Sequence, residues 1–422
     1  MLFTLLASSA LFCLFYWYEN QKISALRSSY MFLGLAILTK GLVAIIIIGG
    51  SFGLFLFIEK KFFQYLRQAL DPIGILLLLA VVLPWHIAAM MQHKGFLWHY
   101  IVEEHFLRFL NQRVPHDYYS GPIYYYLPRI IIYLFPWSLF TPLLFWRTKN
   151  LTPFEKKILR FSWCWLIVPL AFFSLASAKA NYYMIVSMPA LAMLLGIKIK
   201  NLTANNPQHN KIFNLWVMAI LLTVVVGVGV ALLFFGSILK LDDTSKQWLI
   251  ITAIYATGGM IAIMSSIIFN INSQQRSKIS FVVLASLIIP LIITMVSYIK
   301  STIDNLSSSN VGIYLSSQQN NSQLYIYHDF ENFSALAFYA PGCFKIIDSQ
   351  SSDLYYGAHL PQFKSCFIDK KDFLQEITKQ QTYIVVPNKK LQQFYDDVPD
   401  GQSRFSLLKK FDKLTILSTI KI

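Results

Sequence analysis

The 422-residue chain has little charge. Asp, Glu, Lys and Arg make up 14% of it, whereas a soluble domain carries roughly 25%. Hydrophobic residues make up 55%. This shortage of charge argues against an ordinary soluble protein and indicates an integral membrane protein. The chain has room for many membrane spans and one soluble domain.

The sequence also lacks motifs that hold nucleotides or catalytic zinc. It has no P-loop, no G-x-G-x-x-G stretch and no H-E-x-x-H helix, which argues against a nucleotide-driven pump. The apolar segments lack the chain of embedded acids that proton-coupled transporters use. The net charge of +15 arises from Lys and Arg beside the apolar runs, and we expect it to face anionic lipid and not nucleic acid.

Ten apolar runs approach the length of about 20 residues that a membrane span needs. The first has no basic segment before it and continues into aromatic residues, so we expect a membrane helix and not a cleaved signal. The predicted spans are Met1–Tyr18, Ser24–Thr39, Leu42–Ile58, Asp71–Met91, Pro122–Trp146, Glu155–Ala176, Tyr182–Ile197, Ile212–Phe235, Gln247–Phe269 and Ile279–Ile299. They predict a polytopic α-helical membrane domain over residues 1–300.

After Lys300 the composition changes to Ser, Asn, Gln and Asp with short β-rich runs, which predicts a small α/β domain over residues 301–422. The predicted strands are Gln323–His328, Ala335–Tyr339, Phe344–Ile347, Thr382–Val386, Phe405–Phe411 and Leu414–Ile420. The predicted helices are Asp369–Lys379 and Lys390–Tyr395. Cys343 and Cys366 both lie in this domain, and whether they pair as a disulfide stays open.

The distribution of Lys and Arg predicts the orientation, since cytoplasmic loops carry the excess. One set of alternate loops and flanks holds fourteen of these residues and the other set holds seven. The first set is predicted to be cytoplasmic, which puts the segment Trp98–Pro128 and the C-terminal domain outside. Ten spans then put Met1 outside as well. We therefore expect an odd number of further spans upstream, in a longer protein or on a separate N-terminal fragment.

Residues 93–128 contain an interfacial helix and an aromatic loop. The run HYIVEEHFLRF is typical of an amphipathic helix at the membrane interface. Arg108 in it has the guanidinium fork that matches phosphate oxygens, although it also suits a surface position at lipid headgroups. His105 with Glu104 is a candidate for a divalent metal site or an ordinary hydrogen-bonded pair.

The loop after this helix is rich in tyrosine. His116, Tyr124 and Tyr125 are candidates for a wall that contacts a sugar or a lipid. Tyrosines at a membrane interface also form aromatic belts that have no catalytic role. Both interpretations stay open for these three residues.

Two lysines on the outside face interrupt apolar sequence. Lys40 lies in GLAILTKG and Lys179 in SLASAKANYYMIVSMP. A Lys at membrane depth is costly and often functional, although a Lys at a helix end also extends its amine to the interface. Together the two lysines predict a site for an anion at the membrane surface.

The runs GLAILTKG, LPWHIAAM, HYIVEEHFLRF, HDYYSGPIYYYLP and SLASAKANYYMIVSMPALAMLLG occur in this order. They resemble the bacterial polyprenyl-phosphate-dependent GT-C glycosyltransferases, a family that includes lipid A aminoarabinose transferases and protein mannosyltransferases. The resemblance covers about residues 20–200 well and the remainder more loosely. It implies a GT-C-like fold in the bacterial inner membrane, with the C-terminal domain in the periplasm.

The resemblance also implies an activity. A sugar would pass from an undecaprenyl-phosphate-linked donor to an acceptor glycolipid, such as lipid A, or to a protein. Lys40, Arg108, Lys179 and Tyr182 resemble positions around the donor phosphate, and His105 and Glu104 resemble a region where a divalent metal sits. Cations aimed at the departing phosphate stabilise the charge that develops there.

The chain departs from the family in one respect. The family's catalytic Asp lies in the first extracytoplasmic loop, which this chain does not contain. Either the base comes from a missing N-terminal part, which we favour, or another acid such as Asp117 replaces it. Two alternatives stay open: a non-catalytic polyprenyl-phosphate-binding membrane protein, and a flippase or polymerase for lipid-linked glycans.

Overall fold

The computed structural model describes residues 1–116, 120–146, 151–203, 207–234, 241–318, 323–328, 330–340, 342–349, 351, 353–377, 382–398 and 401–419. Contacts group the chain into two units. One consists of Met1–Ala231 with Ile251–Pro290, and the other of Leu232–Ile250 with Leu291–Ile422. The boundary predicted after Lys300 stays a prediction, and helix α12 (Ile288–Leu306) runs through that position.

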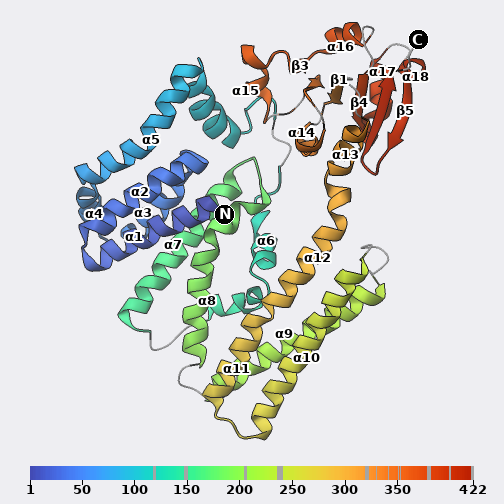
Figure 1. Cartoon of the computed structure of the whole chain (residues 1–422). Helices are drawn as coiled ribbons and strands as arrows, with labels where there is room; N and C mark the ends of the chain where they lie inside the picture. The colour runs from blue at the N-terminus through green and yellow to red at the C-terminus, as the bar shows by residue number, and fades with distance from the viewer. Residues whose placement is uncertain are drawn as a thin grey trace. The chain divides into compact units, whose positions relative to one another are not determined.

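The first part of the chain is helical (Figure 1). It begins with α1 (Leu2–Asn20), α2 (Ile23–Lys40), α3 (Val43–Ile58), α4 (Phe62–Ala69), α5 (Pro72–Gln92) and the π-helix η1 (Trp98–Leu107). It continues with α6 (Tyr126–Tyr133), the 3-10 helix η2 (Trp137–Phe145), α7 (Pro153–Leu175), the 3-10 helix η3 (Asn181–Ser187) and α8 (Met188–Thr203). The helices α9 (Pro207–Phe234), α10 (Asp243–Ile268), α11 (Ser273–Ser286) and α12 follow.

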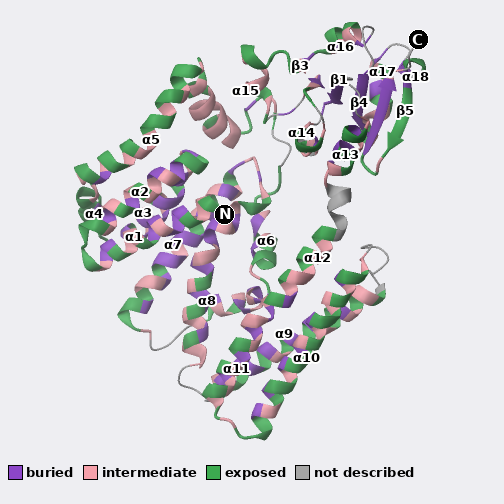
Figure 2. Ribbon diagram, viewed as in Figure 1, coloured by how far each residue is buried: buried purple, intermediate pink, exposed green. Residues whose placement is uncertain are grey.

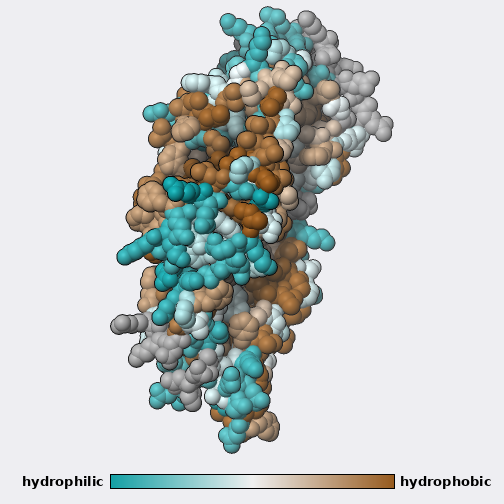
Figure 3. Space-filling model, turned by 90° about the vertical axis from the view of Figure 1, so that its left-hand side faces the viewer, coloured by the Kyte–Doolittle hydropathy of each residue, from teal (hydrophilic) through white to brown (hydrophobic). Residues whose placement is uncertain are grey.

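Seven helical segments in the described part of the chain are long and apolar enough to cross a membrane. They are Leu2–Asn20, Pro72–Gln92, Pro153–Leu175, Asn181–Thr203, Gln208–Leu233, Asp243–Ile268 and Ser273–Lys300, and α3 is a shorter apolar helix. Figure 3 shows hydrophobic residues over broad areas of the face that it draws, as expected where helices meet lipid. The predicted polytopic α-helical architecture is confirmed.

The run Pro122–Trp146 is not the continuous span that the sequence predicted. Helix α6 ends at Tyr133, and η2 begins at Trp137. Pro136 precedes η2 and Pro142 lies inside it. Proline has no N–H for an intrahelical hydrogen bond and clashes with the preceding turn, so an uninterrupted α-helix is disfavoured here.

Aromatic side chains hold α1, α3 and α7 together. The Phe15 ring lies 4.7 Å from that of Phe161 and 5.9 Å from that of Phe55, measured between centroids. Trp165 is fully buried, and its indole N–H donates to the carbonyl of Val186 at 3.0 Å. Figure 2 shows buried residues concentrated on these helices, whereas α5 is mostly exposed. The α1–α3–α7 core therefore forms the rigid support beneath the α2–α3 turn.

The C-terminal sheet has six strands: β1 (Gln323–Tyr327), β2 (Phe344–Ile347), β3 (Phe367–Ile368), β4 (Thr382–Pro387), β5 (Phe405–Lys410) and β6 (Leu414–Thr419). Their order is β3-β2-β1-β4-β6-β5. The first four in this order are parallel, and β6 pairs antiparallel with both β4 and β5. Apolar residues of β1, β4 and β6 form two buried clusters, one on each face. The expected small α/β domain is confirmed.

Short helices cover this sheet: α13 (Ser309–Ser317), η4 (Phe330–Phe333), α14 (Leu336–Tyr339), α15 (Tyr355–Ala358), η5 (Pro361–Phe363), α16 (Lys370–Glu376), η6 (Asn388–Lys390), α17 (Leu391–Asp397) and α18 (Gly401–Arg404). The strand predicted at Ala335–Tyr339 is wrong, because that run forms α14 against α13. The short strand β3 had not been predicted. Cys343 and Cys366 are both exposed and are not bonded to each other.

Candidate functional site

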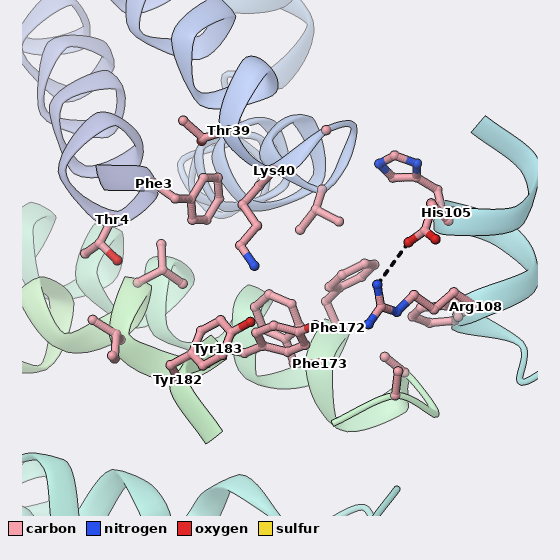
Figure 4. A pocket seen from close by; sticks show the side chains of 18 of the residues that line it. Phe3, Thr4, Thr39, Lys40, His105, Arg108, Phe172, Phe173, Tyr182 and Tyr183 are labelled. Atoms are coloured by element: carbon pink, nitrogen blue, oxygen red, sulfur yellow. Dashed lines mark hydrogen bonds and ion pairs between the residues drawn. The ribbon is translucent and has the colours of Figure 1, made fainter. Parts of the chain in front are cut away.

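A cavity with both charged and apolar lining residues lies within the first unit and has a volume of about 540 Å³. Residues of α1, the α2–α3 turn, α5, η1, α7 and η3 line it. Its polar lining residues include Lys40, Glu104, His105, Arg108 and Tyr182. Five of the nine predicted site residues, from three separate sequence runs, therefore line one cavity, part of which Figure 4 shows.

Gly41 ends helix α2 and sets the direction of Lys40. Its backbone has φ 69° and ψ −152°, a conformation that essentially only glycine adopts. A Cβ at Gly41 would lie 2.3 Å from Nε2 of His105. The missing side chain therefore allows η1 to approach the α2–α3 turn closely.

His105 fastens η1 to that turn. The backbone N–H of Leu42 donates to Nε2 of His105 at 2.9 Å, and Nδ1 lies 2.5 Å from the carbonyl oxygen of Tyr100. Nε2 is the acceptor, so Nδ1 carries the proton and donates to Tyr100. Both ring nitrogens of His105 thus have protein partners, which fixes the position of Arg108 one turn further along.

Lys40 and Arg108 point into the cavity from different elements, Lys40 from the end of α2 and Arg108 from the end of η1 (Figure 4). The Nζ of Lys40 lies 5.0 Å from the ring centroid of Tyr182 and 5.1 Å from that of Tyr183, on η3. Lys40 forms no ion pair within the described ranges, and the positive charge of Arg108 acts on it. Two cations that repel each other across an open space favour an anion between them.

Among the described residues that line the cavity, Glu104 is the one that carries a carboxylate. Its Oε2 accepts from Nη1 of Arg108 at 3.0 Å, and its Oε1 lies 2.9 Å from Nη2 of the buried Arg113. The ring of His99 lies on the same side, with Nε2 3.7 Å from Oε1. Glu104 is therefore committed to orienting arginines, which is a poor arrangement for a general base.

Lys179 occupies a different place from the one that the sequence predicted. It is buried, and its Nζ donates to the carbonyls of Phe173 at 3.1 Å and Ser174 at 2.6 Å, at the C-terminal end of α7. Burial lowers the pKa of the Lys179 amine below its ordinary value. Lys179 does not line the cavity, so the geometry favours a role in capping the C-terminal carbonyls of α7.

His116, Tyr124 and Tyr125 also lie off the cavity lining. The first two are exposed, and Tyr125 donates to Oδ1 of Asn181 at 2.7 Å. Arg129 packs on the ring of Tyr125 and donates to the same Asn181 oxygen at 2.8 Å. These contacts hold the start of η3 and so position Tyr182. Asp117 lies outside the described residues.

The sequence did not predict the apolar part of the lining. Phe3, Leu38, Trp85, Phe109, Phe172 and Phe173 contribute to it, from four helices and from the residues that follow η1. Nothing in the local sequence distinguishes these residues from other apolar residues of the spans. The run GGSFG at positions 49–53 matches the pattern of a hydrolase nucleophile elbow, but it lies inside α3 with Ser51 fully buried.

The helical spans define a class, since the chain is a polytopic membrane protein, and its match to a solved structure shows a GT-C-like fold. Among solved structures it is similar to ArnT from Cupriavidus metallidurans bound to undecaprenyl phosphate, with a TM-score of 0.73 and 15% identity. That match covers 99% of this chain and 74% of ArnT. The apo structure of the same ArnT matches with a TM-score of 0.72.

Curated relatives point the same way. The chain is 26% identical over 373 residues to the undecaprenyl phosphate-alpha-4-amino-4-deoxy-L-arabinose arabinosyl transferase of Yersinia pestis, which covers 84% of this chain and 62% of the relative. The enzymes of the same name from Photorhabdus laumondii and Shewanella sediminis are 28% and 27% identical over 202 and 270 residues, which is 46% and 62% of this chain. No protein-family model matches. The chain spans less than two thirds of the length of these relatives, 35% to 62%. The predicted resemblance to aminoarabinose transferases is confirmed.

Proposed function

We propose that this chain forms the donor-phosphate side of a membrane glycosyltransferase site. A sugar linked to undecaprenyl phosphate would be transferred to an acceptor at the periplasmic face, a glycolipid such as lipid A or else a protein. The observation that carries the proposal is the convergence of Lys40 and Arg108 in a cavity whose other walls are largely apolar. A polyprenyl phosphate has the same division, with an anionic head on an apolar chain.

The chemistry of transfer explains why two cations are useful. When the sugar leaves, the phosphate oxygen gains the negative charge of the broken bond. Lys40 and Arg108 stabilise that charge within a partly apolar cavity, where electrostatic interactions are stronger than in water. Tyr182 lines the same cavity with its ring beside Lys40, and we propose that its hydroxyl donates a further hydrogen bond to the phosphate. Lys179 as a residue that binds the donor phosphate, and His116, Tyr124 and Tyr125 as a substrate wall, stay predictions, and none of the four lines the cavity.

A divalent metal at His105 and Glu104 stays a prediction. His105 has protein partners at both ring nitrogens, and Glu104 is held by two arginines. The described residues contain no group of three or more His, Cys, Asp or Glu side chains arranged to hold a metal. The side chains in these positions do not suit a metal, so we derive no step through one.

The acceptor hydroxyl needs a general base, and the described lining residues include no carboxylate other than Glu104. We propose that the base comes from a segment beyond this chain, on a longer protein or on a separate N-terminal fragment. The proposed location is the bacterial inner membrane, with the C-terminal sheet in the periplasm. The orientation follows from the excess of Lys and Arg on the opposite loops.

The test is direct binding of undecaprenyl phosphate to the purified chain. Lys40→Ala and Arg108→Ala should each weaken binding by about tenfold to 150-fold, because a hydrogen bond to a charged group contributes about 1.5–3 kcal/mol. Lys61→Ala is the matched control. Its Nζ lies over the rings of Tyr18 and Tyr65 at 5.3 and 5.9 Å, much as Lys40 lies over two tyrosines, yet it does not line the cavity. Equal loss in all three variants would contradict the proposal.

A second candidate function is non-catalytic binding of polyprenyl phosphate. The observation in its favour is the pairing of Glu104 with two arginines, which leaves the described lining without an available carboxylate. A transfer assay separates the two functions, since a binder would hold the donor without consuming it. Turnover that appears only when an N-terminal fragment is added would favour the transferase.

A further inference from the structure

The C-terminal sheet carries lysines at the edge where the chain enters it. Lys389 lies two residues after the end of β4, Lys409 and Lys410 end β5, and Lys413 precedes β6. All of these lysines are exposed, and we name the four the basic tip. Asp412 is the acidic residue within the β5–β6 turn, so the basic tip keeps a clear excess of positive charge.

The basic tip lies beside the end of the helix that leaves the membrane. A small cleft is lined by Ser307 and Ser308 on one side and by Phe411 and Lys413 on the other. Those two serines connect α12 to α13 (Figure 1). The membrane-spanning run ends at Lys300, and α12 continues to Leu306, which is about 9 Å further along a helix.

That distance slightly exceeds the thickness of the lipid headgroup layer, which adds about 5–7 Å to each side of the hydrocarbon core, so α12 ends close to the outer edge of that layer. The connection from Leu306 to Ser309 is too short to move the sheet far from this layer. Lysine side chains are long and reach back toward a charged surface. The short connection between α12 and α13 therefore keeps the basic tip close to the lipid headgroups.

The backbone of the basic tip is fixed before any ligand binds. Nδ2 of Asn388 donates to the carbonyls of Phe411 at 2.8 Å and Asp412 at 3.1 Å, and the backbone N–H of Asn388 donates to Lys413. The Nζ of Lys409 lies 4.4 Å from the ring centroid of Tyr314 on α13. A turn that is tied to both β4 and α13 loses little conformational entropy when its lysines engage an anion.

We propose that the basic tip binds the headgroups of anionic lipids and so docks the C-terminal sheet on the membrane surface. Charge complementarity identifies the partner, because an anionic bilayer attracts each nearby Lys strongly enough to change binding about fivefold. The role is separate from the cavity of the first unit. Electrostatic contacts of this kind would hold the sheet at the membrane surface without a large apolar interface.

The test uses the full chain in lipid nanodiscs and hydrogen exchange followed by mass spectrometry. Amides of residues 405–419 should exchange more slowly in discs that contain phosphatidylglycerol than in discs of phosphatidylcholine alone. The difference should disappear at high salt, because salt screens exposed charges. The double variant Lys410→Gln, Lys413→Gln should lower the protection by about 25-fold, since two charges are lost.

A matched control has the same loss of charge at the opposite edge of the sheet. Lys364 precedes β3 and Arg404 precedes β5, and both are exposed. Lys364→Gln with Arg404→Gln should keep the protection, while exchange of β4 reports that each variant is folded. The proposal is overturned if the two lipid compositions give equal exchange, or if the control loses as much protection as the basic-tip variant. Binding of undecaprenyl phosphate should be unchanged in both variants, so failure here is distinguishable from failure of the cavity.

Discussion

Replacing Gly41 by alanine tests how the cavity is assembled. Gly41 has φ 69° and ψ −152°, a conformation that costs a residue with a side chain about 1–3 kcal/mol. The new Cβ would also lie 2.3 Å from Nε2 of His105, so the imidazole must move and lose its hydrogen bond from Leu42. That loss adds about 1 kcal/mol. In the Gly41→Ala variant, the arrangement that places Lys40 and Arg108 in the same cavity is therefore less stable by about 2–4 kcal/mol.

If this cost falls on the binding-competent arrangement, Gly41→Ala should weaken binding of undecaprenyl phosphate by about 30-fold to 700-fold. Direct binding to the purified chain measures it, and thermal unfolding shows whether the helices stay assembled. Gly49→Ala is the control, because a Cβ at Gly49 in α3 meets no other atom closer than 4.0 Å. Binding by Gly41→Ala that equals binding by the control would refute the reasoning.

The double variant Gly41→Ala, His105→Ala separates the two contributions. Removing the imidazole creates room for the new methyl group but leaves the backbone strain in place. Binding that recovers relative to Gly41→Ala identifies crowding as the main cause. Binding that stays equally weak identifies the backbone conformation.

The remaining predictions concern stability. Asp71→Asn should lower the unfolding temperature of the helical part, because Asp71 accepts from Arg27 at 2.9 and 3.2 Å and caps α5 at Gly74; an unchanged unfolding temperature would contradict this. In the sheet, hydrogen bonds from Tyr327 and Lys370 lower the pKa of Asp397, so its contribution to stability is present above the ordinary carboxyl pKa and is lost as the pH falls through the folded value. The protection of β1 amides, relative to the intrinsic exchange rate at the same pH, should therefore fall below about pH 4, and Asp397→Asn should remove that part of the pH dependence; a variant with an unaltered pH profile would show that another group is responsible.

Composition determined the class of the protein because exposing apolar residues to water and burying charge both cost free energy, however the helices pack. Fourteen per cent charge and repeated apolar runs predict membrane helices without reference to their packing. The same logic marked Lys40 and Arg108, since a cation beside apolar sequence needs a reason to be there. The sheet strands also followed from local patterns, apart from α14 and the two-residue β3.

Only the tertiary structure decided which cations meet. Lys40 and Lys179 have similar local sequences, yet one faces the cavity and the other donates to carbonyls of its own helix end. The difference arises from Gly41 and His105, which are far apart in the sequence and touch because η1 packs on the α2–α3 turn. The aromatic walls likewise come from separate helices. A charge in an apolar run reveals that a site exists, whereas its direction depends on contacts between distant segments that local sequence does not encode.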